Sequence, residues 1–290
     1  MCPYRVIDSD IVKAGCEAIF QASSTHAPIP VSILSENKGS GILEEVLNRH
    51  ASAFLFFQDK LGGEISISST PASPEIAFDV SIVEITKNKG VLKVGRYGFI
   101  EIQTMDFHGS YKRAVSNLRD AHRLHKTGFS KALAKNPAWM SEGVEGPNIA
   151  NVFKRTFYQM LLKFELSKKG AAAGTVLAIP KSVWDSWQPF LGRPEIENVK
   201  DTHFRIKGSD NKSYHGTNAW IFVFELDSTS SRSISPISIT AKIRVSATDL
   251  IEHAFVNVPK NMLHWTKSDD ALLQRIRSRI QKALATFQIE

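Results

Sequence analysis

The chain has 290 residues, of which 42% are hydrophobic and 22% charged, and it carries a formal net charge of +7 at pH 7. These proportions are ordinary for a globular protein that buries a substantial core, and no apolar run approaches the ~20 residues that a membrane-spanning helix needs. The N-terminal segment lacks the apolar stretch of a secretory signal, and two cysteines suit a reducing compartment. We therefore expect a cytoplasmic protein with no membrane partner.

The N-terminal part of the chain predicts two helices and a strand. A short helix is expected over residues 11–22, followed by a loop over 23–30. Residues 42–57 (ILEEVLNRHASAFLFF) place their apolar side chains mostly at helical spacing and predict the first clear helix. Residues 60–69 (KLGGEISISS) alternate polar and apolar side chains after two glycines, which predicts a strand.

The next segment predicts a β-hairpin. Residues 76–86 and 91–105 are rich in β-branched and aromatic side chains, and Asn88-Lys89-Gly90 between them has the chemistry of a tight turn. Side chains alternate along a strand, so in the second arm Glu101 and Gln103 share one face of the hairpin.

The hairpin predicts a close pair of carboxylates. If the chain folds back about Gly90, Asp79 falls directly opposite Glu101. Cross-strand Cβ atoms lie roughly 5 Å apart, and like charges placed so destabilise a sheet. The pair therefore predicts a cation between the two carboxylates. A bulge at Gly95 or Gly98 would shift this register.

Most of the positive charge follows the hairpin directly. Residues 107–140 hold seven basic side chains against one acidic side chain. A helix is expected over residues 110–125, with Ser110 as its N-cap and its positive end suited to a DNA phosphate. We interpret the segment as a phosphate-binding surface, with a solvated basic helix face as the alternative. His122 and His125 lie one turn apart, but no Cys or carboxylate cluster completes a metal site with them.

The rest of the chain predicts alternating helices and strands. Strands are expected over residues 174–180, 220–225 and 237–245, and helices over 148–168, 181–190 and 269–287. In the last helix four apolar side chains are expected to point inward: Leu272, Ile276, Ile280 and Leu284. No internal repeat and no linker composition marks a second domain, so we expect one domain over residues 1–290.

The hairpin residues resemble a known active-site signature. Asp79 on one strand and Glu101-Ile102-Gln103 on the next resemble the signature of the PD-(D/E)xK nuclease superfamily, with Gln where Lys is usual. The longer run GFIEIQTMDFHGSYKRAV is similar to type II restriction endonucleases of the NotI family, whose active site also uses Glu-x-Gln. The resemblance covers about residues 75–125. It implies an α/β fold with a restriction-endonuclease-like core, a central mixed β-sheet flanked by helices.

The resemblance implies a metal-dependent hydrolase. Asp79 and Glu101 would bind Mg²⁺, with the Ile102 carbonyl as a third ligand and Mn²⁺ able to substitute. Gln103 would hydrogen-bond the attacking water but brings no positive charge, so we expect heavier reliance on the metal. Catalytic cores of this superfamily often add a supporting carboxylate from a preceding element, for which the candidates are Glu44, Glu45 and Glu64.

The resemblance also implies double-stranded DNA as the partner. The expected activity is site-specific cleavage at a GC-rich palindrome by a homodimer, in a bacterial or archaeal cytoplasm, with a cognate DNA methyltransferase encoded separately. The catalytic core would span about residues 40–190, and the part from about 191 to 290 would serve DNA recognition or dimerisation. Eight residues are expected to contact DNA: His108, Ser110, Tyr111, Lys112, Arg113, Arg119, Arg123 and Lys126.

The chain departs from the NotI family in its cysteines. Cys2 and Cys16 cannot build the family's cysteine-ligated iron site, so we expect no structural iron or zinc. Two other functions remain open. One is a DNA-binding protein on an inactive nuclease fold, for which the Gln in place of Lys would be a sign. The other is a repair or recombination nuclease that acts on DNA structures instead of sequences.

Overall fold

The computed structural model describes residues 9–21, 27–34, 39–59, 61–103, 107–109, 112–141, 144–147, 149–207, 218–226, 237–265 and 269–283. The chain forms two compact units. Unit 1 comprises Met1–Ile102 and Leu161–Glu290, and unit 2 comprises Gln103–Met160. The single nuclease domain stays a prediction, but the sequence did not indicate that residues 103–160 form a compact unit within its core.

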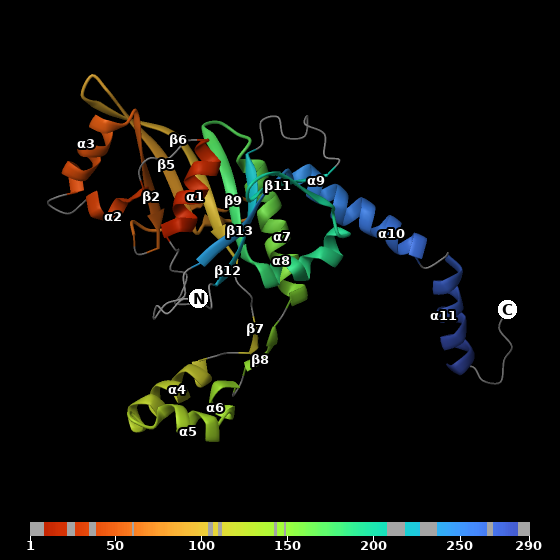
Figure 1. Ribbon diagram of the computed structural model, residues 1–290. Coiled ribbons are helices and arrows are strands. Elements are labelled where there is room, and N and C mark those ends of the chain that lie inside the picture. The colour runs from red at the N-terminus through yellow and green to blue at the C-terminus, as the bar shows by residue number, and fades with distance from the viewer. Residues whose placement is uncertain are drawn as a thin grey trace. The chain divides into compact units, whose positions relative to one another are not determined.

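The central sheet of unit 1 has nine strands within the part of the chain that the structure describes. Their spatial order is β1 (Ile29–Pro30), β2 (Ser52–Gln58), β5 (Val80–Asn88), β6 (Val91–Ile102), β9 (Ala172–Pro180), β12 (Ala219–Leu226), β13 (Ile237–Val245), β11 (His203–Ile206) and β10 (Ile196–Lys200) (Figure 1). Strands β2, β5 and β6 form an antiparallel meander, whereas β9 runs parallel to both β6 and β12. The sheet is therefore mixed, as expected.

The predicted helix over residues 42–57 is wrong in its second half. Helix α3 (Gly39–Arg49) ends before β2, which takes up the run SAFLFF. Phe54 packs into the core on one face of the sheet, while Ala53 and Leu55 pack with Leu43 of α3 on the other. A short apolar run that is buried on both faces suits a central strand better than a helix, which would leave part of it in water.

Two short strands precede the hairpin. β3 (Ile65–Ile67) pairs antiparallel with β4 (Ile76–Phe78) in a small separate sheet. The predicted strand over residues 60–69 is therefore shorter than expected, and its side chains are exposed. Asp79 stands between β4 and β5, at the point where the chain passes from the small sheet to the central one.

Helices cover both faces of the central sheet. Val176 and Ala178 of β9 pack into a core with α1 (Ser9–Phe20). Thr175 points to the opposite face, because neighbouring side chains of a strand alternate, and its Oγ1 donates to the Lys163 carbonyl of α7 (Ile149–Leu166) at 3.4 Å. Helix α8 (Lys181–Trp187) also contacts β9 and β12. The α/β class predicted from the sequence is confirmed.

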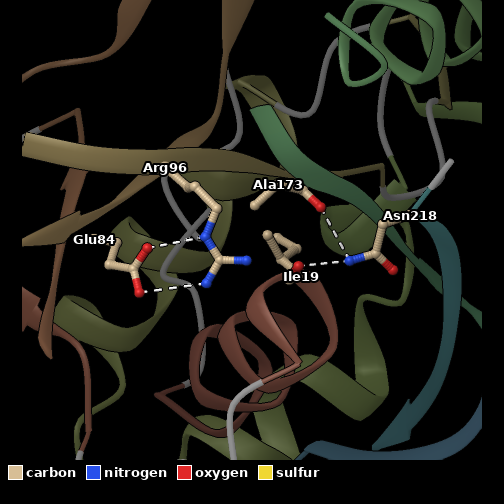
Figure 2. Close-up of polar contacts among 5 residues, drawn as sticks. All are labelled: Ile19, Glu84, Arg96, Ala173 and Asn218. Carbon is tan, nitrogen blue, oxygen red and sulfur yellow. Dashed lines mark hydrogen bonds and ion pairs between the residues drawn. The ribbon is translucent and has the colours of Figure 1, made fainter. Parts of the chain in front are cut away.

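One side chain connects α1 to two strands of the sheet. Asn218, just before β12, directs its Nδ2 to the carbonyl oxygens of Ala18 (3.0 Å), Ile19 (2.5 Å) and Ala173 (3.0 Å). Figure 2 shows the contacts to Ile19 and Ala173. Two of these carbonyls belong to the last turn of α1, where intrahelical donors run out. Asn218 therefore provides a hydrogen-bond donor for carbonyl groups at the end of α1 and fixes the helix over the sheet.

A residue of β6 also contacts α1. The Arg96 guanidinium donates to Glu84 of β5 (2.9 Å from Nε), as Figure 2 shows, and also lies over the Phe20 ring at 5.5 Å from its centroid. Nearby, the helix approaches the strand so closely that a Cβ on Gly98 would stand 2.4 Å from Ile19 Cγ2. Only glycine fits this crossing of helix and strand.

Unit 2 consists of short helices and a two-stranded sheet. Strands β7 (Phe107–Gly109) and β8 (Val144–Pro147) pair antiparallel, and the unit also includes the first part of α7. Its remaining helices are α4 (Lys112–Leu124), α5 (Phe129–Lys135) and α6 (Ala138–Ser141). Two histidines in and just after α4 contact aromatic rings of this unit. His122 meets the Phe129 ring edge-on, and His125 stacks with the Trp139 ring.

The C-terminal helices differ from expectation. The segment after β13 is helical through α9 (Ala247–Ile251), a π-helical turn (Glu252–Asn257), α10 (Val258–Trp265) and α11 (Asp269–Ala283), with η1 (Gln188–Leu191) and α2 (Val31–Leu34) as the other short helices. Ile276 and Ile280 of α11, expected inward, are 45% and 40% exposed, so that prediction is wrong. The side chains of Leu272 and Leu284 lie outside the described residues, and within those residues no helix is long and apolar enough to cross a membrane.

Candidate active site

The β5–β6 hairpin brings Asp79 and Glu101 together as the sequence predicted. Lys89 and Gly90 form a two-residue turn in which both φ angles are positive (48° and 82°), the conformation that the twist of a hairpin favours. A bulge lies on β6, where Gly95 and Arg96 stand opposite Glu84, between the pairs Val83–Tyr97 and Ile85–Val94. It moves the register by one residue, so that Val80 pairs with Ile100 and Asp79 faces Glu101 at the open end.

Each carboxylate accepts a hydrogen bond from the opposite strand. Asp79 Oδ2 accepts from the Ile102 amide at 2.9 Å, and Glu101 Oε1 accepts from the Asp79 amide at 3.3 Å. These bonds continue the ladder of the hairpin beyond its last regular pair. Backbone amides of the opposite strand therefore help to position both side chains.

A lysine from helix α7 completes the cluster. Lys163 Nζ lies 2.6 Å from Glu101 Oε2, and the two side chains are only 7% and 14% exposed. The ammonium also lies over the Phe78 ring at 5.3 Å from its centroid, and Phe78 stacks on Phe99. The helix turn that carries Lys163 is held by the Thr175 contact to its carbonyl and by Phe164, which is fully buried.

Carboxylates outnumber ammonium groups among these three side chains. Asp79 and Glu101 contribute two carboxylates and Lys163 one ammonium. The pKa of Glu101 is raised to about 7, chiefly by burial and next by the charge of Asp79, while Lys163 lowers it. Burial disfavours a charged carboxylate unless cations or donors compensate. The arrangement therefore suits one more cation.

The donors suit a hard divalent cation. Asp79 and Glu101 offer carboxylate oxygens, and Ile102, the third predicted ligand, ends β6 beside them. Mg²⁺ and Mn²⁺ prefer oxygen ligands of this kind and bind through one or two carboxylates. The Ile102 amide is engaged with Asp79, and its side chain is buried in the core with α1.

The other predicted site residues are placed as follows. Gln103 follows Ile102 directly and is half-buried. Glu44 and Glu45 are exposed on α3, where they pair with Lys87 and Arg49, and Glu64 is exposed before β3. Among the described residues no group of three or more His, Cys, Asp and Glu side chains could hold a metal. None of the three glutamates is thus grouped with the Asp79–Glu101 pair, and their supporting role stays a prediction.

The predicted DNA contacts belong to unit 2. Arg113, Arg119, Arg123 and Lys126 are exposed, and Arg123 makes a long ion pair with Asp120 at 3.8 Å. Ser110 and Tyr111 lie outside the described residues, as do the side chains of His108 in β7 and Lys112 at the start of α4.

Sequence reasoning missed Lys163, although a signal was present. The buried positions of α7 recur at helical spacing and include Thr156, Met160 and Lys163. A lysine in the middle of such a stripe is rarely buried without a partner. Its position on the stripe indicates an acidic partner in the core, but not which one.

In comparisons with known proteins, no family model and no curated protein matches the chain. The function is therefore argued from the geometry of the cluster itself.

Proposed function

We propose that the protein is a type II restriction endonuclease that hydrolyses phosphodiester bonds of double-stranded DNA with Mg²⁺. The observation that carries the proposal is the Asp79–Glu101 pair, held face to face at the end of a hairpin with Lys163 in contact with Glu101. The order of elements supports it as well. A helix and a strand, α7 and β9, follow the hairpin, and β9 lies parallel beside β6, in keeping with the PD-(D/E)xK core that the resemblance implies.

The chain's own residues divide the work as follows. Asp79 and Glu101 would hold the metal, with the Ile102 carbonyl as a further ligand. When bound, Mg²⁺ supplies Lewis acidity and lowers the pKa of a coordinated water. Gln103, one residue beyond Ile102, can accept from or donate to the attacking water. The Glu101 pKa of about 7 means that a metal must compete with a proton at this carboxylate below neutral pH.

Binding of duplex DNA would come from the basic residues of unit 2. The exposed Arg113, Arg119, Arg123 and Lys126 offer positive charge for phosphates, which supplies most sequence-independent affinity for DNA.

The test is digestion of a large sequenced DNA with Mg²⁺, comparing wild type with Asp79→Asn and Glu101→Gln. Both variants keep the shape of the side chain and remove its charge. We expect wild type to give discrete fragments and both variants to lose at least ~10³-fold in rate. Glu195→Gln removes an exposed carboxylate that pairs with Lys207, and this matched control is expected to cleave like wild type.

Each outcome separates the candidate functions. Discrete fragments identify a site-specific nuclease, and their ends give the recognition sequence. Smearing, or cutting only at branched or flapped substrates, would support a structure-specific nuclease instead. Binding of DNA without any Mg²⁺- or Mn²⁺-dependent cleavage would mean an inactive binding module. Cleavage that survives both substitutions would place the active site elsewhere.

The proposal includes a homodimer, because a palindromic site presents two equivalent scissile bonds related by a two-fold axis. The mass in solution tests this part by itself. We expect twice the chain mass of 32.3 kDa by light scattering at micromolar concentration, with and without DNA. A monomer both free and on DNA would contradict the dimer and leave the nuclease proposal standing.

A further inference from the structure

We infer that Lys163 is a catalytic residue of this site: its ammonium, brought by helix α7, contacts the scissile phosphate and supplies the positive charge that Gln103 cannot. The inference rests on the proposed function and deepens it, because it names the group that stabilises the transition state. Lys163 Nζ stands 2.6 Å from Glu101 Oε2, and both side chains are largely buried.

Stability alone does not explain this lysine. Removing an ammonium and a carboxylate from water costs several kcal/mol per ion, and the attraction between them offsets this only in part. A well-packed apolar pair of similar volume is often as stable or more stable. The position belongs to the buried stripe of α7, where Met160 and Phe164 are its neighbours, so an apolar side chain would fit the pattern of the helix.

The choice of partner points to chemistry. Lys163 pairs with Glu101, the carboxylate that faces Asp79, and not with one of the many exposed acids of unit 1. Lys163 thus stands at the two carboxylates that would hold the metal. A divalent cation and the ammonium together would give a positive centre beside them, which suits the phosphate of a nucleic acid.

The ammonium is also held in place. Phe78 lies under it, at 5.3 Å from the ring centroid, and the Lys163 carbonyl accepts from Thr175 Oγ1 of β9. Pre-positioned charge is effective because nothing needs to reorganise as the reaction proceeds. The role is electrostatic throughout. In hydrolysis the water oxygen forms a bond to phosphorus and its proton passes to solvent, the bond from phosphorus to the leaving oxygen breaks, and that oxygen takes up a proton from solvent. Lys163 forms no covalent bond and supplies charge and a hydrogen bond to a phosphoryl oxygen.

The experiment compares Lys163→Gln, Lys163→Arg and the control Lys168→Gln in the full chain. Gln can still donate to Glu101 but carries no charge, whereas Arg keeps the charge. Lys168 lies just beyond the end of the same helix and pairs with Glu165 on the surface. We expect Lys163→Gln to lower kcat by about 10²–10³-fold with a nearly unchanged KM for DNA, Lys163→Arg to recover at least part of the rate, and Lys168→Gln to cleave like wild type.

Mg²⁺ affinity distinguishes catalysis from structure. Removing the ammonium makes the carboxylate pair more negative, so at pH 8.5, where Glu101 is ionised, Lys163→Gln should bind Mg²⁺ as tightly as wild type or more tightly by calorimetry. A structural role predicts the opposite, since a disordered pair would lose its metal. Slow cleavage together with undiminished metal binding therefore supports the inference, and parallel loss of both overturns it.

The remaining outcomes are also decisive. If wild type cleaves, Asp79→Asn does not and folded Lys163→Gln cleaves at the wild-type rate, the inference is wrong and the proposed function stands. If wild type never cleaves, the proposed function and the inference fail together. Should Lys163→Gln not fold, Lys163→Met is the second variant, because a methionine suits the apolar stripe of α7. The same rates and metal affinities then decide.

Discussion

Glu101 is the carboxyl whose pKa both Asp79 and Lys163 affect. It accepts from the Asp79 amide and from Lys163, yet burial raises its pKa from an ordinary 4.5 to about 7. A carboxyl whose pKa is higher in the folded protein than in the unfolded chain stabilises the fold in its protonated form. That contribution is full below about pH 4.5 and is lost as the pH rises through about 7.

The titration of Glu101 gives a prediction for the metal-free protein. The shift from 4.5 to about 7 corresponds to a loss of about 3 kcal/mol in the free energy of unfolding between pH 4.5 and 8. Glu101→Gln cannot titrate, so its stability should fall by about that much less over the same range. Urea unfolding of both proteins in EDTA at pH 5 and pH 8 measures the difference. Identical pH dependence of the two proteins would contradict the raised pKa.

At the scale of elements, three contacts hold α1 against the sheet that carries the hairpin. Gly98 of β6 allows Ile19 to approach, Asn218 closes the end of the helix, and Arg96 lies over Phe20. The same stretch of β6 runs on to Glu101 a few residues later. Packing of α1 therefore supports the strand that carries the carboxylate.

Gly98→Ala tests this crossing. The added Cβ would stand 2.4 Å from Ile19 Cγ2 and 2.9 Å from the Gly174 carbonyl oxygen. Because backbone and helix must both shift, we expect a loss of about 1–3 kcal/mol in the free energy of unfolding. The matched control is Gly41→Ala in α3, where nothing lies within 4 Å of the new methyl group. Thermal unfolding should show the control unchanged or stabilised by ~0.5–1 kcal/mol. Equal stability of both variants would refute the close approach.

At the scale of the whole molecule, the chain leaves unit 1 just after Glu101 and returns just before Lys163. Unit 2 occupies the sequence between them, and α7 is continuous across the boundary at Met160 and Leu161. The two partners of one buried ion pair are thus separated by the whole basic segment. This order makes the sequence around Glu101 a poor guide to its cation.

The charge of unit 2 gives a prediction for DNA binding. Arg119→Ala/Arg123→Ala should weaken binding to every duplex, and the slope of log affinity against log salt should fall by about 2, or ~0.9 for each phosphate that the protein no longer neutralises. Lys13→Ala/Lys207→Ala removes two exposed positive charges from unit 1 and is the matched control. Fluorescence anisotropy at several salt concentrations measures both slopes. An unchanged slope in the α4 variant would place the phosphate-binding residues elsewhere.

Local patterns in the sequence were sufficient for the hairpin, because the turn at Lys89-Gly90 and the alternation on each side of it depend on neighbours in the chain. The turn alone would place Glu101 opposite Phe78, and the bulge moves the register so that Glu101 faces Asp79. The predicted register was right because a bulge added the one residue by which a two-residue turn would have missed it. Strongly periodic segments such as α7, β9 and β12 were predicted for the same reason.

Only the tertiary structure decided the rest. The apolar run of β2 became a strand because both of its faces are covered, and the apolar stripe of α11 is exposed although its spacing alone predicted burial. The helical spacing of α7 indicates that Lys163 is buried but not what it pairs with, because its partner Glu101 lies on another element and meets it only when α7 packs on the sheet. Spacing in a sequence tells which side chains share a face, but the partner of a buried charge is set by which faces meet.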